Sequence, residues 1–505
     1  MLNWRRMPGS SPRLRPSRDS PAALESAIRL RARLSLYVAL LVTIGGVLLL
    51  LRLSRPPSTR ELQAIDALQA TWIGVDFAAR PEVQLLQRYV AIDTTEPDAD
   101  ELSGARFLAE RLAEAGLEPH VEQVGERRAN VWAFVEGDDP KAIVLSGHID
   151  VDPVLEEAGW LFPPLGGAID GPWIYGRGMY DMKSLAVAQL LATIDIANSG
   201  RRPRRSILFL QTSAEEVGSD TGVRWILRQH PELVERMGLV LTEGGVVEAI
   251  SAQDVKYWGI EFAQKRFASI TFCGENRERL EELHRLLRET GKGDPRPAIT
   301  PAVRDFLRPY SSTRGLGSYR ALLADPERTL RRRTDYDRLT NFMQALFRDE
   351  LVPFPVEPSP AGGYSMLVAV HLLPDSDLEV VLAELLPEWK TVGLTYAVVP
   401  ALGSRHASPI DSEDFARLVR AIEDGHPGVT VGPYFLPWAA TDSRFYREAG
   451  IPSYGFSPFL LTVTETMQIS RPNERMQLPG YLRGVALYRK LIRELPGRGL
   501  DHMAR

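Results

Sequence analysis

Six side chains that can bind a metal ion or move protons follow strand-like segments or precede a helix. They are one imidazole and five carboxylates: His148, Asp150, Asp181, Glu215, Glu216 and Glu243. In open parallel sheets, ligands bind beyond the carboxyl ends of the strands. An imidazole with several carboxylates and no thiolate is a ligand set suited to zinc or a similar divalent ion. The sequence therefore predicts a hydrolytic metal site at one edge of a sheet.

Two local spacings suggest how the chemistry is divided. His148 and Asp150 are two residues apart, so on an extended segment their side chains face the same way. Asp150 can then hold the imidazole in the tautomer that a metal requires. Glu215 and Glu216 are adjacent and point differently, which lets one bind metal while the other carries protons. Each motif alone is also typical of a turn or a solvated helix cap, but their shared placement favours a common site.

An alternation of strand and helix patterns from about residue 81 positions these side chains. The apolar run "KAIVLSGHID" is typical of a parallel strand that is buried on both faces. "RRSILFLQTSAEE" and "GLVLTEGG" are further strands, and "ELSGARFLAERLAEAG", "KSLAVAQLLATIDIANSG" and "GVRWILRQHPELV" are helices. This alternation predicts an α/β fold with a mainly parallel sheet and helices on both faces.

The pattern changes near residue 256. "KYWGIEFAQKRFASITFCG", a charged helix and the later "YSMLVAVHLLPDSDLEVVLAELL" indicate a smaller α+β unit. The α/β pattern resumes with "DSEDFARLVRAIEDG". We therefore expect a catalytic domain made of residues 81–255 and 405–495, with residues 256–404 inserted between them.

The N-terminal region contains an uncharged run, Leu34–Leu51, of 18 residues. As a helix it would span about 27 Å, close to the thickness of the hydrocarbon core of a bilayer. Arginines are denser before the run than after it, which predicts a cytoplasmic N-terminus and an extracytoplasmic remainder. A cleaved signal peptide is the alternative, but no small-x-small cleavage site follows the run. We expect an Arg-rich cytoplasmic tail (1–33), a single transmembrane anchor (34–53) and a stalk (54–80).

Length and composition narrow the class of protein. A chain of 505 residues is too long for one simple core, so two folded domains are expected. The net charge of −5 gives no reason to expect nucleic-acid binding. The lone Cys273 excludes an intramolecular disulfide and a zinc site built from cysteines.

Several longer motifs carry a family resemblance. "LSGHIDVDPV", "GWLFPPLGGAIDGPWIYGRGMYDMKS", "TSAEEVGSDTG" and "LTEGG" occur in this order. Together they resemble the co-catalytic zinc peptidases of metallopeptidase family 20, which includes aminoacylase-1, carboxypeptidase S and bacterial glutamate carboxypeptidase. The later "PWAATDSRFYREAGIPSYGFSP" and "PNERM" are similar to the carboxypeptidase S branch, which often has an N-terminal membrane anchor. The resemblance implies two zinc ions bridged by an aspartate, and an inserted lid domain that often forms homodimers.

The resemblance also implies a role for each matching residue. Asp181 would bridge the two ions. His148 and Glu243 would complete one metal site, and Glu216 would serve the other. Glu215 would be the general base that accepts a proton from water.

Ser470 is the main departure from the family pattern. The family's histidine ligand of the second site lies three residues before the Asn of the "NE" pair, where this chain has Ser470, a poor zinc ligand. The inserted region also lacks the family's oxyanion-stabilising histidine, and His371 stands where an arginine is typical. We therefore expect one zinc ion, or two with a replacement ligand such as Glu465 or Gln468.

Two functions remain in contention. The first is a membrane-anchored zinc metallohydrolase that cleaves an amide bond in a small peptide or N-acyl amino acid. Arg444 in "TDSRFY" is a candidate for binding the substrate carboxylate, because a guanidinium fork suits that group, and a structural salt bridge is its alternative role. The second function is that of a catalytically impaired pseudoenzyme that binds a ligand or partner. We favour the hydrolase because the first metal site is complete.

Overall fold

The computed structural model describes residues 74–154, 159–251, 254–296, 298–313, 316–359, 362–466 and 468–496. The predicted tail and transmembrane anchor (1–33 and 34–53) and most of the stalk lie outside these residues. Within the described part of the chain, no helix is both long and apolar enough to cross a membrane. The described residues from Asp76 onward belong to one compact unit.

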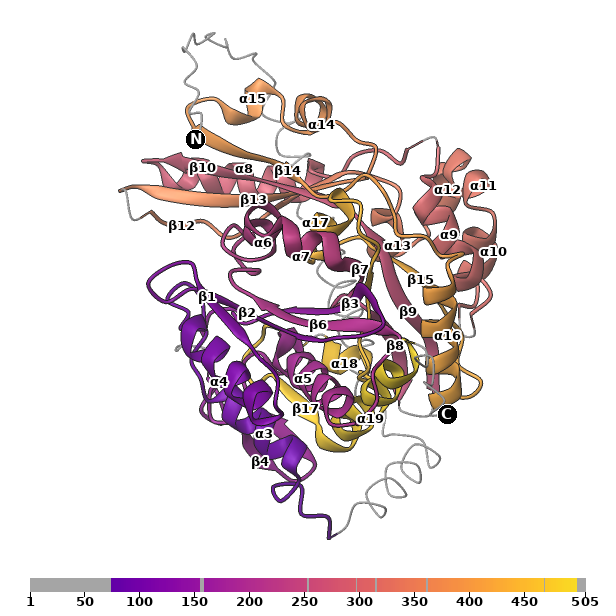
Figure 1. Ribbon diagram of the computed structural model, residues 1–505. Coiled ribbons are helices and arrows are strands. Elements are labelled where there is room, and N and C mark those ends of the chain that lie inside the picture. The colour runs from indigo at the N-terminus through magenta and orange to yellow at the C-terminus, as the bar shows by residue number, and fades with distance from the viewer. Residues whose placement is uncertain are drawn as a thin grey trace, which may run out of the picture. The chain divides into compact units, whose positions relative to one another are not determined.

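The larger of the sheets has the strand order β1-β2-β6-β3-β7-β16-β9-β15, with β8 paired to β9 (Figure 1). Its strands are β1 (His120–Gln123), β2 (Ala129–Val135), β3 (Asp139–His148), β6 (Arg205–Thr212), β7 (Met237–Thr242), β8 (Val246–Ser251), β9 (Asp254–Gln264), β15 (Val431–Leu436) and β16 (Ser453–Gly455). β6, β3, β7 and β16 are parallel to one another, as are β9 and β15, whereas β1, β2 and β6 pair antiparallel. The predicted α/β fold with a mainly parallel sheet is confirmed.

Helices cover both faces of this sheet (Figure 1). One face carries α6 (Val223–Gln229) and α7 (Pro231–Arg236), which pack on alternate side chains of the central strands. The other face carries α3 (Pro81–Val90), α4 (Glu101–Glu114), α5 (Ser184–Ala197) and α19 (Leu478–Glu494). Ile143, Val144 and Leu145 in β3 have no exposed surface. This burial explains the continuous apolar run, since a strand covered on both faces has no solvent side.

Two helices, α6 and α7, replace the single helix predicted over "GVRWILRQHPELV". α6 ends at Gln229, and His230 has non-helical dihedral angles (φ −120°, ψ 63°) before Pro231 starts α7. Proline fits the first turn of a helix but lacks the N–H needed further in, and it disfavours the helical region for the residue before it. The break therefore follows from Pro231.

A second, antiparallel sheet has the order β11-β13-β10-β14, with β12 beside β13. Its strands are β10 (Arg266–Gly274), β11 (Glu350–Pro353), β12 (Glu357–Pro358), β13 (Tyr364–Leu372) and β14 (Thr395–Leu402). α8 (Arg277–Thr290) and α14 (Leu378–Leu385) contribute to its core on one face, where Leu283 and Val381 join Ile270 and Val368. The chain passes from the larger sheet to this one at Lys265. The boundary predicted at residue 256 lies inside β9.

Shorter helices fill the remaining connections. They are α9 (Pro301–Tyr310), α10 (Tyr319–Ala324), α11 (Pro326–Arg331), α12 (Arg333–Tyr336), α13 (Asn341–Ala345), α15 (Glu388–Thr391), α16 (Glu413–Gly425), α17 (Ser443–Glu448) and α18 (Val463–Thr466). α9 packs against β15 of the larger sheet, with the rings of Phe306 and Tyr434 4.9 Å apart.

A third, three-stranded sheet links distant parts of the chain. It has the order β17-β5-β4 and is made of β4 (Ala168–Asp170), β5 (Trp173–Tyr175) and β17 (Arg475–Gln477). β5 leads into η2 (Met179–Lys183), the irregular turn of helix that carries Asp181. Because β17 pairs with β5, the loop that contains Ser470 is held near this turn.

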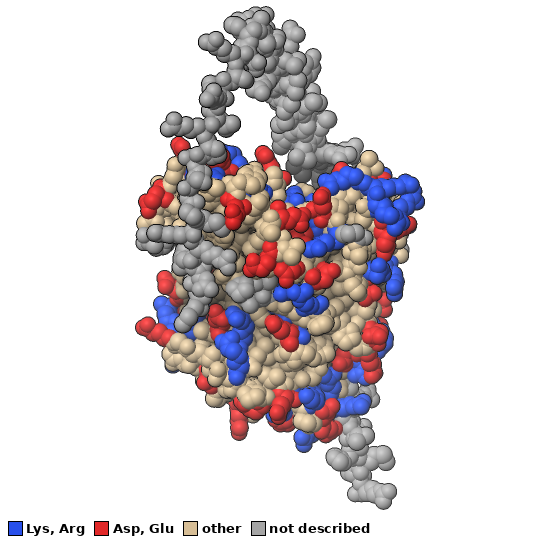
Figure 2. Space-filling view, turned by 90° about the horizontal axis from the view of Figure 1, so that it is seen from above, with Lys and Arg blue, Asp and Glu red and all other residues tan. Residues whose placement is uncertain are grey.

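Charged side chains of both signs share the surface. On the face shown in Figure 2, acidic and basic side chains of the described residues are interspersed. Exposed pairs one helical turn apart, such as Arg277 with Glu281, contribute at most about 1 kcal/mol each. No large area of one sign covers the described part of the face shown.

Candidate metal centre

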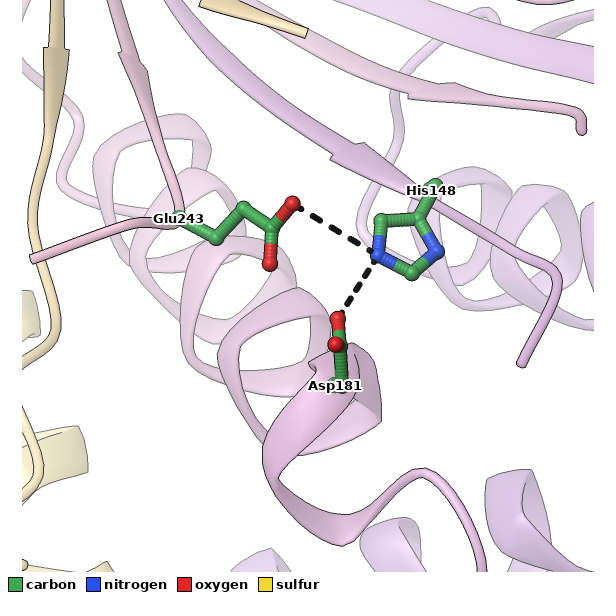
Figure 3. A group of neighbouring side chains, drawn as sticks. All are labelled: His148, Asp181 and Glu243. Carbon is green, nitrogen blue, oxygen red and sulfur yellow. Dashed lines mark hydrogen bonds and ion pairs between the residues drawn. The ribbon is translucent and has the colours of Figure 1, made fainter. Parts of the chain in front are cut away.

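Three of the predicted residues converge at the carboxyl edge of the larger sheet (Figure 3). Nε2 of His148 lies 3.0 Å from Oδ1 of Asp181 and 3.8 Å from Oε1 of Glu243. One ligand atom from each of the three residues lies within 4.8 Å of the others. β3 and β7 are parallel neighbours, so His148 at the end of β3 and Glu243 just after β7 emerge side by side. The spacing is that of a candidate metal-binding group.

The orientation of His148 directs Nε2 toward the carboxylates of Asp181 and Glu243. Nδ1 lies 2.8 Å from the backbone oxygen of Asp150, to which its N–H donates, so Nε2 presents its lone pair to two carboxylates. Burial lowers the pKa of His148, but the carboxylates of Asp150, Asp181 and Glu243 outweigh it and raise the pKa well above its usual value. A lone pair facing two carboxylates is repulsive, so a proton or a metal ion must lie between them.

Asp150 supports the site differently from the prediction. Its carboxylate oxygen Oδ1 is 3.5 Å from Nδ1 of His148, and its backbone oxygen is the closer partner of the ring. The two carboxylate oxygens instead accept the backbone N–H groups of Glu215 and Glu216, each at 3.0 Å. Asp150 therefore fixes the loop that carries these two glutamates.

The negative charges of the carboxylates around His148 are not balanced by neighbouring cationic side chains in the described part of the chain. Burial raises the pKa of Glu215 to about 8, and the charge of Asp442 adds to the rise. Burial and then the charge of Asp181 raise the pKa of Glu216 to about 11. Oε1 of Glu216 is buried and has no hydrogen-bond partner among the described residues. This orphaned oxygen and the imidazole with its carboxylates fit a divalent cation, which would supply the missing charge.

Arg444 lies near Glu215 as a buried cation. Arg444 is 7% exposed, and its guanidinium carbon lies 4.6 Å from the ring centroid of Phe445. Nε has no partner, and no ion pair to this residue occurs within the described parts of the chain. Its charge lowers the pKa values of Glu215 and Asp442, so it is close to both. The alternative prediction, that Arg444 forms a structural salt bridge, is therefore not supported by this geometry.

Ser470 lies in the loop before β17. The residue is exposed and has a positive φ of 60°. Its backbone oxygen accepts a hydrogen bond from Nη2 of Arg177 at 3.2 Å, and Nη1 of the same arginine donates to Oε2 of Glu474 at 2.7 Å. Glu465, one of the predicted replacement ligands, uses Oε2 to accept the N–H and hydroxyl of Thr462 at 2.7 and 2.8 Å.

Sequence reasoning missed a second group of buried acids, which includes Asp150. Glu96, Glu101 and Asp150 are all buried and bring carboxylate oxygens within 4.8 Å of one another. Arg128 donates to Glu96 at 2.5 and 2.8 Å and to Glu101 at 2.7 Å. Glu101 also accepts the N–H of Ala214 at 2.7 Å, which braces the loop before Glu215. Glu96 and Glu101 were hard to predict as part of a site, because "TTEPDADE" spans a loop and the start of a helix and does not follow a strand.

A cavity at the opposite ends of the same strands is not part of this site. It has a volume of about 690 Å³ and is lined by residues that include Lys141, Arg205 and Asp414. Arg205 is paired with both oxygens of Asp414 at 3.0 and 2.9 Å. None of the candidate residues lines it, so the candidate site rests on the convergence at the carboxyl edge.

Comparisons with known proteins agree with this geometry. Residues 144–494 match the family model described as Peptidase family M20/M25/M40. Aminoacylase-1A from Rattus norvegicus is 26% identical over 427 residues, which cover 82% of this chain and 95% of the relative. Succinyl-diaminopimelate desuccinylase from Methylocella silvestris is 35% identical over 127 residues, or 24% of this chain and 32% of that protein.

Solved structures show the same fold. An M20 family metallo-carboxypeptidase from Sulfolobus solfataricus has a TM-score of 0.62 at 14% identity and covers 83% of this chain and 99% of its own. Human carnosine dipeptidase 1 has a TM-score of 0.59 at 16% identity, with 86% and 98% covered. The family match spans most of the chain and includes His148, Asp181 and Glu243. The chain therefore belongs to peptidase family M20/M25/M40, whose members are metal-dependent hydrolases of C–N bonds.

Proposed function

We propose that this protein is a zinc-dependent hydrolase that cleaves the amide bond of a small peptide or an N-acyl amino acid. The observation that carries the proposal is the convergence of His148, Asp181 and Glu243 beside the proton-accepting Glu215. The similarity to an aminoacylase over 82% of this chain supports the N-acyl amino acid as substrate class.

The residues present fit a zinc ion. Nε2 of His148 and the carboxylates of Asp181 and Glu243 are the nitrogen and oxygen ligands that zinc accepts in hydrolytic sites. A bound divalent ion supplies Lewis-acid polarisation and lowers the pKa of water. The backbone carbonyl of Asp150 holds the ring of His148 in the tautomer that keeps Nε2 free for a ligand bond.

Glu215 is the residue we assign to proton transfer. In the metal-free protein burial raises its pKa to about 8, and the charge of a bound divalent ion would lower it, so that the carboxylate can accept a proton near neutral pH and return it. Its backbone N–H is fixed by Asp150, so its position does not depend on substrate. Glu215 accepts a proton from the attacking water and delivers it to the leaving nitrogen.

Arg444 is the residue we assign to the substrate carboxylate. A buried guanidinium without a carboxylate partner is costly, and a ligand carboxylate would complete it. Its closeness to Glu215 puts that carboxylate near the bond to be cleaved. N-acyl amino acids and peptides with a free C-terminus both provide this group.

We further propose that the run Leu34–Leu51 anchors the protein, so that the catalytic part is extracytoplasmic. We also propose that the protein belongs to the carboxypeptidase S branch and forms homodimers through the smaller sheet. They are supported by the motifs around Arg444 and by the separate antiparallel sheet.

Two measurements on the purified full-length protein test the proposal. Metal analysis after dialysis should find at least one zinc ion per chain. Hydrolysis of a panel of N-acyl amino acids and dipeptides should fall sharply in Glu215→Gln, while Glu122→Gln, a change on β1, should leave it unchanged. If zinc is absent, or if Glu215→Gln hydrolyses as fast as the parent, the pseudoenzyme alternative replaces the hydrolase.

A further inference from the structure

The turn that carries Asp181 obtains a hydrogen-bond acceptor from near the end of the chain. In this turn, η2, both Asp181 and Met182 have non-helical dihedral angles. The first N–H groups of a helix have no acceptor within the helix, and Gly178, the residue before η2, has no side chain that could cap it. The N–H of Tyr180 donates instead to Oε1 of Glu474, 294 residues later, at 2.9 Å. Glu474 therefore holds the backbone immediately before Asp181.

Glu474 is itself held in place on several sides. The residue has no exposed surface, and its Oε2 accepts a hydrogen bond from Nη1 of Arg177 at 2.7 Å. Its backbone oxygen accepts the N–H of Gly176 at 3.0 Å, and β17, which pairs with β5, starts at the next residue. Because both carboxylate oxygens have a donor, a shift of Oε1 away from Tyr180 would also disturb the bond to Arg177.

Arg177 extends this contact to two other segments. It is 3% exposed, and its Nη2 donates to the backbone oxygens of Pro153 at 3.1 Å and Ser470 at 3.2 Å. Pro153 follows the segment of Asp150, whose carboxylate accepts the backbone N–H of Glu215. The ion pair of Arg177 with the buried glutamate therefore connects the turn of the metal-site aspartate with the segment after Asp150 and with the loop of Ser470.

We propose that Glu474 is a positioning residue, which keeps the carboxylate of Asp181 directed at His148 so that the two can share a zinc ion. Oδ1 of Asp181 lies 3.0 Å from Nε2 of His148 (Figure 3), and the turn that brings it there is the one that Glu474 holds. The inference rests on the proposed function, because Asp181 is a ligand only if a metal ion binds there. The competing explanation is that the ion pair with Arg177 only stabilises the fold, since the loss of one partner of a buried pair is costly in itself.

Zinc binding to the full-length protein, measured by competition with a chromogenic chelator, tests the inference. Glu474→Asp keeps the negative charge beside Arg177 but shortens the side chain, which withdraws its oxygen from the N–H of Tyr180. Zinc should bind this variant about 10- to 100-fold more weakly than the parent, the range expected for partners that orient a metal ligand. Asp195→Asn is the matched control, because it removes the ion pair with Arg489 at the opposite end of α5 and should bind zinc as the parent does.

Urea unfolding and hydrogen exchange of the metal-free proteins separate positioning from stability. The amide of Tyr180 should exchange faster in Glu474→Asp than in the parent, while the variant still unfolds cooperatively. The inference is overturned if Glu474→Asp is less stable but binds zinc with parental affinity, because the ion pair is then only structural. It is also overturned if Asp195→Asn weakens zinc binding as much as Glu474→Asp does. A parent protein that binds no zinc would overturn the proposed function itself, and this inference with it.

Discussion

Zinc should stabilise this protein more strongly as the pH rises. In the metal-free folded protein, Glu215 keeps its proton up to about pH 8, whereas in the unfolded chain it releases it near its ordinary pKa of 4.5. Between these values the unfolded state binds fewer protons, so the metal-free protein loses stability as the pH rises through this window. Zinc removes the penalty, because its charge lets the carboxylates ionise in the folded state.

The size of the effect follows from the shift of Glu215. A rise from 4.5 to about 8 corresponds to about 5 kcal/mol at 1.36 kcal/mol per pKa unit. The side chain is partly exposed, so solvent screening reduces the effect to roughly 2 kcal/mol. Burial also raises the pKa of Glu101 to about 8. We expect Glu101 to titrate in the same way with and without zinc, so its contribution cancels when the two stabilities are subtracted. The gain from zinc should therefore grow by about 2 kcal/mol between pH 5 and pH 8.

Urea unfolding at pH 5, 6, 7 and 8, with chelator and with excess zinc, measures this difference. In Glu215→Gln the stabilisation by zinc should increase less with pH than in the parent, because the amide does not titrate. Glu122→Gln serves as the matched control. A zinc effect that is the same at every pH, or that falls as the pH rises, would refute the assignment of buried carboxylates to the metal site.

Three other substitutions test single residues. Glu215→Gln should lower kcat by about 10²- to 10⁴-fold with unchanged metal content, measured by hydrolysis and metal analysis, and an unaffected kcat contradicts its role. Arg444→Gln should lower kcat/KM by about 10- to 100-fold for substrates with a free carboxylate and leave their methyl esters unaffected, and equal losses for both would count against it. Arg128→Met should lower the free energy of unfolding by about 3–5 kcal/mol, because it leaves two buried carboxylates unpaired. Arg127→Met, on an exposed neighbour, should cost little in the same denaturant titration, and a similar loss there would contradict this reading.

Local patterns were enough to predict the sheet and the edge where the site lies. β3 is a continuous apolar run because both its faces are covered, and such runs are typical of strands in parallel sheets. His148 and Glu243 then come together without further information, since the ends of parallel neighbours meet at one edge. Asp181 lies just before α5, in the irregular turn η2, and the long motif around it carried the prediction.

The details that depend on tertiary packing were not predictable. Spacing showed that Asp150 faces the same way as His148, but it did not show that the backbone oxygen, at 2.8 Å, would hold the ring. The hydrogen bond from Arg128 to Glu101 joins the chain before β2 to the start of α4, and no periodic pattern in the sequence predicts this contact. The passage between sheets at Lys265 was missed because β9 and β10 are similar in composition and almost continuous in the chain.

X-ray diffraction from crystals of this protein grown with zinc, with anomalous data collected at the zinc absorption edge, is the most direct test of the metal centre. We predict an anomalous peak about 2 Å from Nε2 of His148 and in contact with the carboxylates of Asp181 and Glu243. Crystals that contain zinc elsewhere but show no peak among these three side chains would contradict the account.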